Sequence, residues 1–153
     1  MGRTHAAAAR AGITLDAGAL IALDRGDKRL IALLGRALAQ RLKFRVPSGV
    51  VGQAWRDSRI QVTLARFLRI DEVEIIPLDE QLARACGELC GVTDTADIID
   101  ASVVILARER GDRIVTSDPH DLRRLDPTCT IIPIGTYAPG KPNGKFLGRH
   151  SAR

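Results

Sequence analysis

Residues 13–23 read Ile-Thr-Leu-Asp-Ala-Gly-Ala-Leu-Ile-Ala-Leu: a short apolar run, one aspartate and a second apolar run. The first run, Ile13 to Leu15, predicts a short strand. The second run predicts a helix from Ala17 to Leu23 that closes at Gly26. Asp16 stands between them, so its carboxylate is expected just beyond the end of a strand.

The same alternation of strand and helix signals continues along the chain. Further strands are predicted at residues 44–46, 73–76, 114–116 and 130–132. Helices are predicted between them, at residues 27–42, 48–56, 60–68, 79–90, 97–110 and 119–125. Strands separated by helices indicate βαβ units, so we expect a single α/β domain with a mostly parallel sheet flanked by helices.

Polar and small residues suggest where these helices begin and end. Asp27, Ser48, Asp79 and Thr95 are expected to cap helix starts, and Gly91 is expected to end one helix. The helix that follows Asp27 should bury one apolar face, made of Leu30, Ile31, Leu34, Leu38 and Leu42.

Charge is distributed unevenly around a net value of +5. Residues 1–11 and 138–153 hold six basic residues and no acidic one, so residues 12–137 hold the other 17 basic and all 18 acidic residues. We expect a disordered lead at 1–11, one domain at 12–137 and a basic flexible tail at 138–153. The basic character therefore belongs to the ends and is a weak argument for nucleic-acid binding.

Neither export nor membrane insertion is expected. The sequence has no run of 18 or more apolar residues, and its first residues lack the apolar core of a secretory signal. The odd set Cys86, Cys90 and Cys129 is typical of a reducing cytosol, which predicts a cytoplasmic protein with free thiols. No histidine lies near Cys86 and Cys90 in the sequence, which argues against a zinc site.

Four aspartates suggest chemistry. Asp16 and Asp118 each follow an apolar run, so both should project beyond the carboxyl ends of parallel strands. Asp97 and Asp100 are three residues apart on one predicted helix and share a face. Clustered carboxylates repel one another unless a cation neutralises them, and Mg²⁺, with Mn²⁺ as an alternative, suits such a set. A metal placed there can promote phosphodiester cleavage.

Each aspartate also has a simpler interpretation. Asp16 can cap the helix that follows it, and Asp97 can complement the positive start of its own helix. Asp118, followed by Pro119, fits a turn that begins a helix. Asp100 is the hardest to explain in this way, because it lies one turn into an otherwise apolar helix. Together the four favour a site.

Four segments, in order and spacing, resemble PIN-domain proteins and specifically the VapC toxins of toxin–antitoxin pairs. They are residues 15–23, Val46-Pro47-Ser48 with the following helix, residues 100–107 and residues 114–122. The resemblance extends from about Ile13 to Ile134. It implies a parallel sheet flanked by helices and a magnesium-dependent endoribonuclease that cleaves RNA.

The resemblance also implies partners. A type II toxin of this kind is inhibited by a VapB-like antitoxin, whose basic or apolar segment occupies the acidic groove. It also implies a homodimer, for which the helices between Val50 and Leu68 are a plausible contact surface.

A phospho-acceptor receiver domain shares the alternating layout, but it needs a lysine after a late strand. The lysines of this chain are not so placed, being Lys28, Lys43, Lys141 and Lys145.

By resemblance, Asp16, Asp100 and Asp118 fall on the metal-binding acidic positions of the family, and Thr116 falls on a hydroxyl position near them. One position departs from the family: Gln53 stands where a glutamate is usual. Our hypothesis is that Asp97 supplies the missing carboxylate, so that all four aspartates are catalytic metal ligands. The alternative is a PIN-like module that has lost catalysis and only binds RNA or protein.

Overall fold

The computed structural model describes residues 11–135, and the predicted basic tail and all but the last residue of the predicted lead lie outside that range. The described strands are β1 (Ile13–Leu15), β2 (Phe44–Pro47), β3 (Val73–Ile76), β4 (Arg113–Thr116) and β5 (Ile131–Pro133). The described helices are α2 (Ala17–Asp24), α3 (Lys28–Ala39), α4 (Ser48–Ala54), α5 (Val62–Leu68), α6 (Glu80–Thr93), α7 (Ile98–Arg110) and α8 (Pro119–Leu125). Within this part of the chain, no helix is long and apolar enough to cross a membrane.

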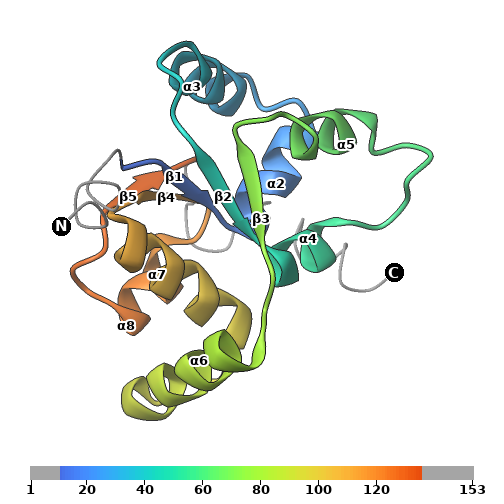
Figure 1. The fold of residues 1–153 in the computed structure, drawn as a ribbon. Helices are drawn as coiled ribbons and strands as arrows, with labels where there is room; N and C mark the ends of the chain where they lie inside the picture. Colours follow the sequence, from blue (N-terminus) through green and yellow to red (C-terminus); the bar gives the residue numbers. More distant parts are fainter. Residues whose placement is uncertain (1–10, 136–153) are drawn as a thin grey trace, which may run out of the picture.

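The strands form one sheet in the order β3-β2-β1-β4-β5, and every pair of neighbours is parallel (Figure 1). The central strand β1 pairs with β4 so that Leu15 lies opposite Val115. The predicted α/β class, with a parallel sheet flanked by helices, is therefore confirmed. Because β1 and β4 are neighbours, the residues that follow them emerge side by side at one edge of the sheet.

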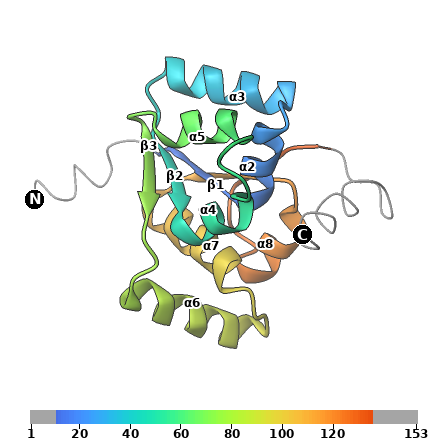
Figure 2. The same cartoon turned by 90° about the vertical axis from the view of Figure 1, so that its right-hand side faces the viewer.

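Helices cover both faces of the sheet (Figures 1 and 2). Helices α2, α3 and α5 lie on one face, and α7 and α8 lie on the other, with α6 packed on α7. The core between these layers is apolar, and its largest fully buried side chains include Phe44, Leu15, Leu20, Leu30, Leu64, Ile114 and Leu122. Strands β1 and β4 are buried on both faces, which is why their sequences are apolar runs and not alternating patterns.

A buried charged group ties together the starts of the three central strands. Asp112, immediately before β4, accepts hydrogen bonds from the backbone N–H of Gly12 at 2.7 Å and from the Thr14 hydroxyl at 2.9 Å. It also pairs with Arg45 of β2, whose Nη1 lies 2.7 Å from its Oδ1. A buried carboxylate needs several donors of this kind. The polar network at this edge is thus structural and lies at the opposite end of the strands from Asp16.

Three predicted helix features are wrong. Helix α3 ends at Ala39 and not at residue 42, since the chain turns at Arg41, which adopts a left-handed conformation. Ile31 points outward and is 45% exposed, whereas Leu30 and Leu34 are buried. Helix α6 continues through Gly91 to Thr93 and ends at Asp94, which takes the left-handed conformation instead of the glycine.

The predicted caps are partly correct. Asp27 and Asp79 accept the backbone hydrogen bonds expected of N-caps. Ser48 makes no such bond; its hydroxyl accepts a hydrogen bond from the Leu78 backbone N–H at 3.1 Å. The N-cap of α7 is Asp97 and not Thr95. The Thr95 hydroxyl instead forms a hydrogen bond with the Thr93 hydroxyl.

Candidate metal centre

Two of the four aspartates meet because β1 and β4 are neighbouring parallel strands. Asp16 follows β1 directly, and its backbone N–H donates to the carbonyl oxygen of Val115 in β4 at 3.3 Å. Asp118 follows β4 after Ser117 and lies at the N-cap position of α8. Both residues therefore stand at the carboxyl edge of the sheet, where open parallel sheets bind ligands.

The Thr116 hydroxyl connects these two aspartates. Its oxygen donates a short hydrogen bond to Asp16 Oδ2 and accepts one from the backbone N–H of Asp118 at 2.8 Å. The other carboxylate oxygen of Asp16 accepts from the Ala19 backbone N–H at 2.9 Å, so Asp16 also caps α2. Asp16 is only 6% exposed and Thr116 is fully buried. The orientation of the Asp16 carboxylate is therefore fixed by donors to both of its oxygens.

Gly18 allows the turn after β4 to approach the start of α2. A Cβ atom at Gly18 would lie 2.0 Å from Ser117 Oγ and 3.1 Å from Ser117 Cβ. Real Cβ atoms do not come so close to another heavy atom, so a larger residue here would force the Ser117 side chain to move. The glycine in the Asp16-Ala17-Gly18 sequence thus leaves room for Ser117, the residue between Thr116 and Asp118.

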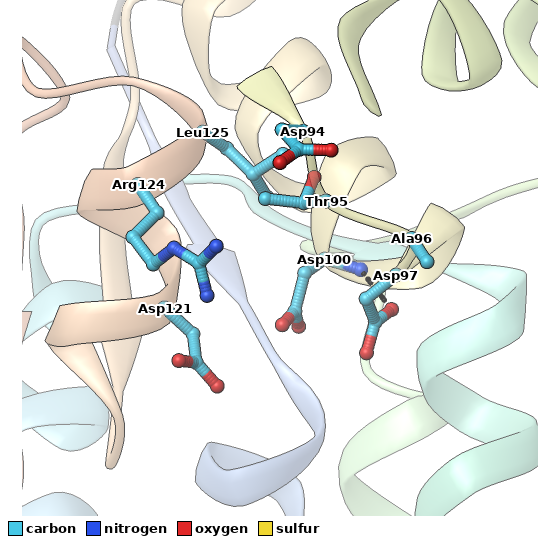
Figure 3. A pocket seen from close by; sticks show the side chains of 8 residues that line it. All are labelled: Asp94, Thr95, Ala96, Asp97, Asp100, Asp121, Arg124 and Leu125. Atoms are coloured by element: carbon cyan, nitrogen blue, oxygen red, sulfur yellow. Dashed lines mark hydrogen bonds between the residues drawn. The ribbon is translucent and has the colours of Figure 1, made fainter. Parts of the chain in front are cut away.

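The other two aspartates lie at the start of α7 and share a pocket (Figure 3). Asp97 Oδ1 accepts a hydrogen bond from the Asp100 backbone N–H at 2.9 Å, as an N-cap does. Both carboxylates point into a pocket of about 430 Å³, lined by Asp94, Thr95, Ala96, Asp97, Asp100, Asp121, Arg124 and Leu125. Asp97 thus stands at the positive start of its helix, as the simpler interpretation expects, and in addition caps that helix with one oxygen, while its second oxygen takes no part in the cap.

Asp121 is a fifth acidic residue that the sequence interpretation did not single out. It lies on α8, faces the same pocket as Asp100, and acts electrostatically on both Asp100 and Asp118. The signal was available: Asp121 follows Asp118 by three residues, the spacing that pairs Asp97 with Asp100.

The pKa values show that these carboxylates lie near one another. Burial first, and then the charges of Asp97, Asp16, Asp121 and Asp118, raise the pKa of Asp100 to about 7. Burial also raises the pKa of Asp16 to about 6, against the opposing effect of its hydrogen bonds. Shared negative charge of this strength is typical of functional sites.

The pKa of Asp118 is also raised, although the residue as a whole is exposed. Partial desolvation of its carboxyl, followed by the charge of Asp121, raises its pKa, whereas His120 acts in the opposite sense. The site thus holds several carboxylates whose ionised forms disfavour one another, and a bound cation would relieve that repulsion.

Gln53 stands apart from this group. It is exposed on α4 and lines a separate pocket of about 50 Å³ with residues that include Asp24 and Arg56. Within the described part of the chain, Gln53 does not line the acidic pocket. The charge of the acidic pocket therefore does not depend on whether position 53 carries an amide or a carboxylate group.

The donor set fits Mg²⁺ in chemistry and in charge. The candidate ligands are carboxylate oxygens, which hard cations prefer, and the three cysteines are free thiols located elsewhere. Within residues 11–135, no group of three or more His, Cys, Asp or Glu side chains is arranged so that it could hold an ion by itself. Mg²⁺ requires no such cage, because it keeps several waters and takes one or two carboxylates.

Among the comparisons with known proteins, the comparison of structures finds matches and the comparisons of sequence find none. No family model matches the sequence, and no curated protein matches it. The fold is similar to that of a chain in the crystal structure of VapBC2 from Rickettsia felis bound to a DNA fragment from their promoter. That match has a TM-score of 0.60 and 17% identity and covers 79% of this chain and 97% of that one.

Two further structures agree. DNA-bound VapBC from Salmonella typhimurium matches with a TM-score of 0.59 and 18% identity, over 81% of this chain and 98% of that one. FitAcB from Neisseria gonorrhoeae matches with a TM-score of 0.56 and 16% identity, over 78% and 96%. Identities this low establish the fold alone. The described domain therefore has the PIN fold of VapC structures, as the sequence resemblance implied.

Proposed function

We propose that this protein is a magnesium-dependent endoribonuclease of the VapC type, the toxin of a type II toxin–antitoxin pair. The observation that carries the proposal is electrostatic: Asp100 on α7 feels the charges of Asp16 and Asp118, which follow two adjacent strands. Asp16 and Asp118 stand at the edge of the sheet where ligands bind in such folds, and Asp97 and Asp100 line the acidic pocket at the start of α7. The PIN fold of the matching structures supports the same activity.

The residues proposed to hold Mg²⁺ are Asp16, Asp100 and Asp118, with Asp97 as a fourth in place of the usual glutamate. One or two of these carboxylates would bind the ion directly, and the others would hold its water ligands. When bound, the ion supplies a nucleophilic water and stabilises the charge that develops on the RNA phosphate. Thr116 keeps the Asp16 carboxylate oriented for this role. Asp100, whose pKa is about 7, gives up its proton as the site is loaded.

Partners follow from the same proposal. The matching structures are two-component complexes named VapBC, VapBC2 and FitAcB, which supports a VapB-like antitoxin for this chain. We propose that a basic or apolar antitoxin segment covers the acidic pocket. Ile60 and Val62, 77% and 48% exposed, support a homodimer contact at the helices between Val50 and Leu68.

The second candidate function is a PIN module that binds RNA or protein without cleaving it. The observation in its favour is Gln53, which supplies no charge and lies outside the acidic pocket. This candidate differs from the nuclease in one measurable respect, because an inactive binder has no need to retain affinity for magnesium.

RNA cleavage by the wild type and by Asp100→Asn tests the proposal. We expect the wild type to cut RNA with magnesium and to stop when a chelator is added. Asp100→Asn should lose at least a hundredfold in rate while keeping its fold, as judged by circular dichroism. Equal, metal-independent cleavage by both proteins would refute a nuclease at this site, and magnesium binding without cleavage would favour the binding module.

A further inference from the structure

The acidic pocket contains one basic side chain, Arg124. It lies three residues after Asp121 on α8, so the two side chains share a face of that helix. The guanidinium extends into the pocket beside Asp121 (Figure 3). Arg124 is exposed and forms no ion pair or hydrogen bond with any residue of the described part of the chain.

Two arginines on neighbouring helices have acidic partners, unlike Arg124. Arg108 pairs with Asp126 at 3.0 Å, and on α6 Arg84 pairs with Glu80 at 2.7 Å. Arg124 lines the pocket together with four carboxylates, yet it forms no ion pair with any of them. Its donors thus remain available to a molecule that enters the pocket.

A polyanionic substrate meets an electrostatic problem here. The pocket is lined by four carboxylates, those of Asp94, Asp97, Asp100 and Asp121. One divalent cation offsets two negative charges, so the loaded pocket would still repel an RNA phosphate. An unpaired guanidinium on the pocket wall offsets one further negative charge and is the one local attraction that the described residues of the pocket lining offer to a phosphate. It also offers a planar pair of N–H donors that match two phosphate oxygens.

We propose that Arg124 is a substrate-binding residue that donates to a backbone phosphate of the RNA as it enters the acidic pocket. This inference rests on the proposed nuclease function and names the group that receives the substrate. The contact is to phosphate and carries no base preference. Arg124 therefore sets affinity for the RNA backbone, and the choice of sequence is made elsewhere.

Arg123 provides the matched control. It is adjacent, exposed and basic, and it lies in the same last turn of α8, but it does not line the pocket. Arg124→Ala and Arg123→Ala thus remove the same charge and the same interaction with the helix terminus. They differ in that Arg124 lines the acidic pocket and Arg123 does not. Arg124→Lys keeps the positive charge and removes the planar pair of N–H donors of the guanidinium.

The first measurement is binding of a single-stranded RNA oligonucleotide, by fluorescence anisotropy, to the full chain in chelator, where no cleavage occurs. We expect Arg124→Ala to raise Kd roughly tenfold, Arg123→Ala to stay within about twofold, and Arg124→Lys to fall between them. The slope of log K against log salt should decrease by about 0.7 for Arg124→Ala, the value for one lost contact to a single strand. Equal binding by the two alanine variants would overturn the inference.

The second measurement is cleavage with magnesium. We expect Arg124→Ala to raise KM with kcat nearly unchanged, because the phosphate is held equally in the ground and transition states. A loss confined to kcat, with normal RNA binding, would overturn the inference and leave the nuclease standing. If instead Arg124→Ala weakens RNA binding but the wild type never cleaves, the phosphate contact stands and the proposed nuclease fails.

Discussion

At the scale of single residues, two buried threonines on adjacent strands perform the same task at opposite ends of the sheet. Thr116 donates to Asp16 at the carboxyl edge, and Thr14 donates to Asp112 at the other edge. Both threonines are fully buried. Only the first contacts an aspartate of the candidate metal centre, so comparing them separates a stabilising hydrogen bond from one that also orients a ligand.

Replacement of Thr116 by valine should therefore affect both stability and metal binding. The Asp16 carboxylate would lose a donor without gaining solvent, at a cost of about 1–3 kcal/mol in the free energy of unfolding, measured by urea denaturation. Loss of an orienting hydrogen bond typically costs 10–100-fold in metal affinity or activity, measured by magnesium titration and cleavage. Thr14→Val should cost similar stability but leave magnesium affinity unchanged. Equal magnesium affinities in the two variants would contradict the orienting role.

Residue by residue, the sequence predicted more of the candidate site's positions than of its bonds. Asp16 and Asp118 were identified because they end apolar runs, and parallel pairing of the strands brings them together. The sequence offers helix cap and metal ligand as alternative roles for Asp16, whereas in the structure one carboxylate oxygen caps α2 and the other accepts from Thr116. The i, i+3 spacing of Asp118 and Asp121 is a signal in the sequence, but it points to the acidic pocket only once α8 is placed beside the start of α7.

At the scale of elements, the start of α7 decides how many ligands the site has. Asp97 caps this helix, and the Asp97 charge also contributes to the raised pKa of Asp100. The cap explains why an acidic residue stands there, and it leaves one oxygen uncommitted. Asn caps a helix about as well as Asp, so a substitution exists that removes the charge and keeps the helix start.

Asp97→Asn should therefore abolish RNA cleavage while changing the free energy of unfolding by less than about 0.5 kcal/mol. Asp97→Ala should lose cleavage and also about 1 kcal/mol, because the cap is gone. Asp79 caps α6 with the same bond, at 2.8 Å to the Leu82 backbone N–H, so Asp79→Asn is the control for a cap alone. Near-normal cleavage by Asp97→Asn would mean that Asp97 is a cap and nothing more.

Elements were predicted well where the apolar pattern was strong and poorly where a helix ended. The runs at residues 13–15 and 114–116 became central strands, since both faces of each are covered. Gly91 was read as a helix end, but α6 continues past it because Asp94 adopts the left-handed conformation. Helix ends depend on local backbone choices that several residues can make, so sequence alone predicts them less sharply than it predicts the cores.

At the scale of the whole molecule, the two edges of the sheet differ in how their buried carboxylates are stabilised. At one edge, Asp112 is neutralised by Arg45 within the fold. At the other, Asp16 and Asp100 pair with no basic side chain of residues 11–135, and their pKa values rise to about 6 and about 7. The native state there holds protons that the unfolded chain, with carboxyl pKa values near 3.8, releases. Ionising these carboxylates therefore costs stability in the native state, and the proposed cation would offset that cost.

This difference predicts how stability depends on pH. Native pKa values above the unfolded ones mean that the native state binds more protons between about pH 4 and pH 7, so metal-free stability should fall as pH rises through that window. The Tm in chelator, followed by circular dichroism, should decrease accordingly, by roughly 2–4 °C for each kcal/mol lost. Asp57 and Asp126, whose pKa values are lowered, titrate below the window and leave the trend intact.

Magnesium should reverse the trend, because it binds the ionised carboxylates of the native state and shifts unfolding by mass action. At pH 8 millimolar magnesium should raise the wild-type Tm, and at pH 5, where Asp100 is protonated, it should have little effect. Asp100→Asn should start with a higher metal-free Tm at pH 8 and respond weakly to magnesium. A wild-type Tm that stays constant or rises from pH 4 to pH 7 in chelator would show that the charge at this edge is already balanced by the protein, and the case for a cation would fail with it.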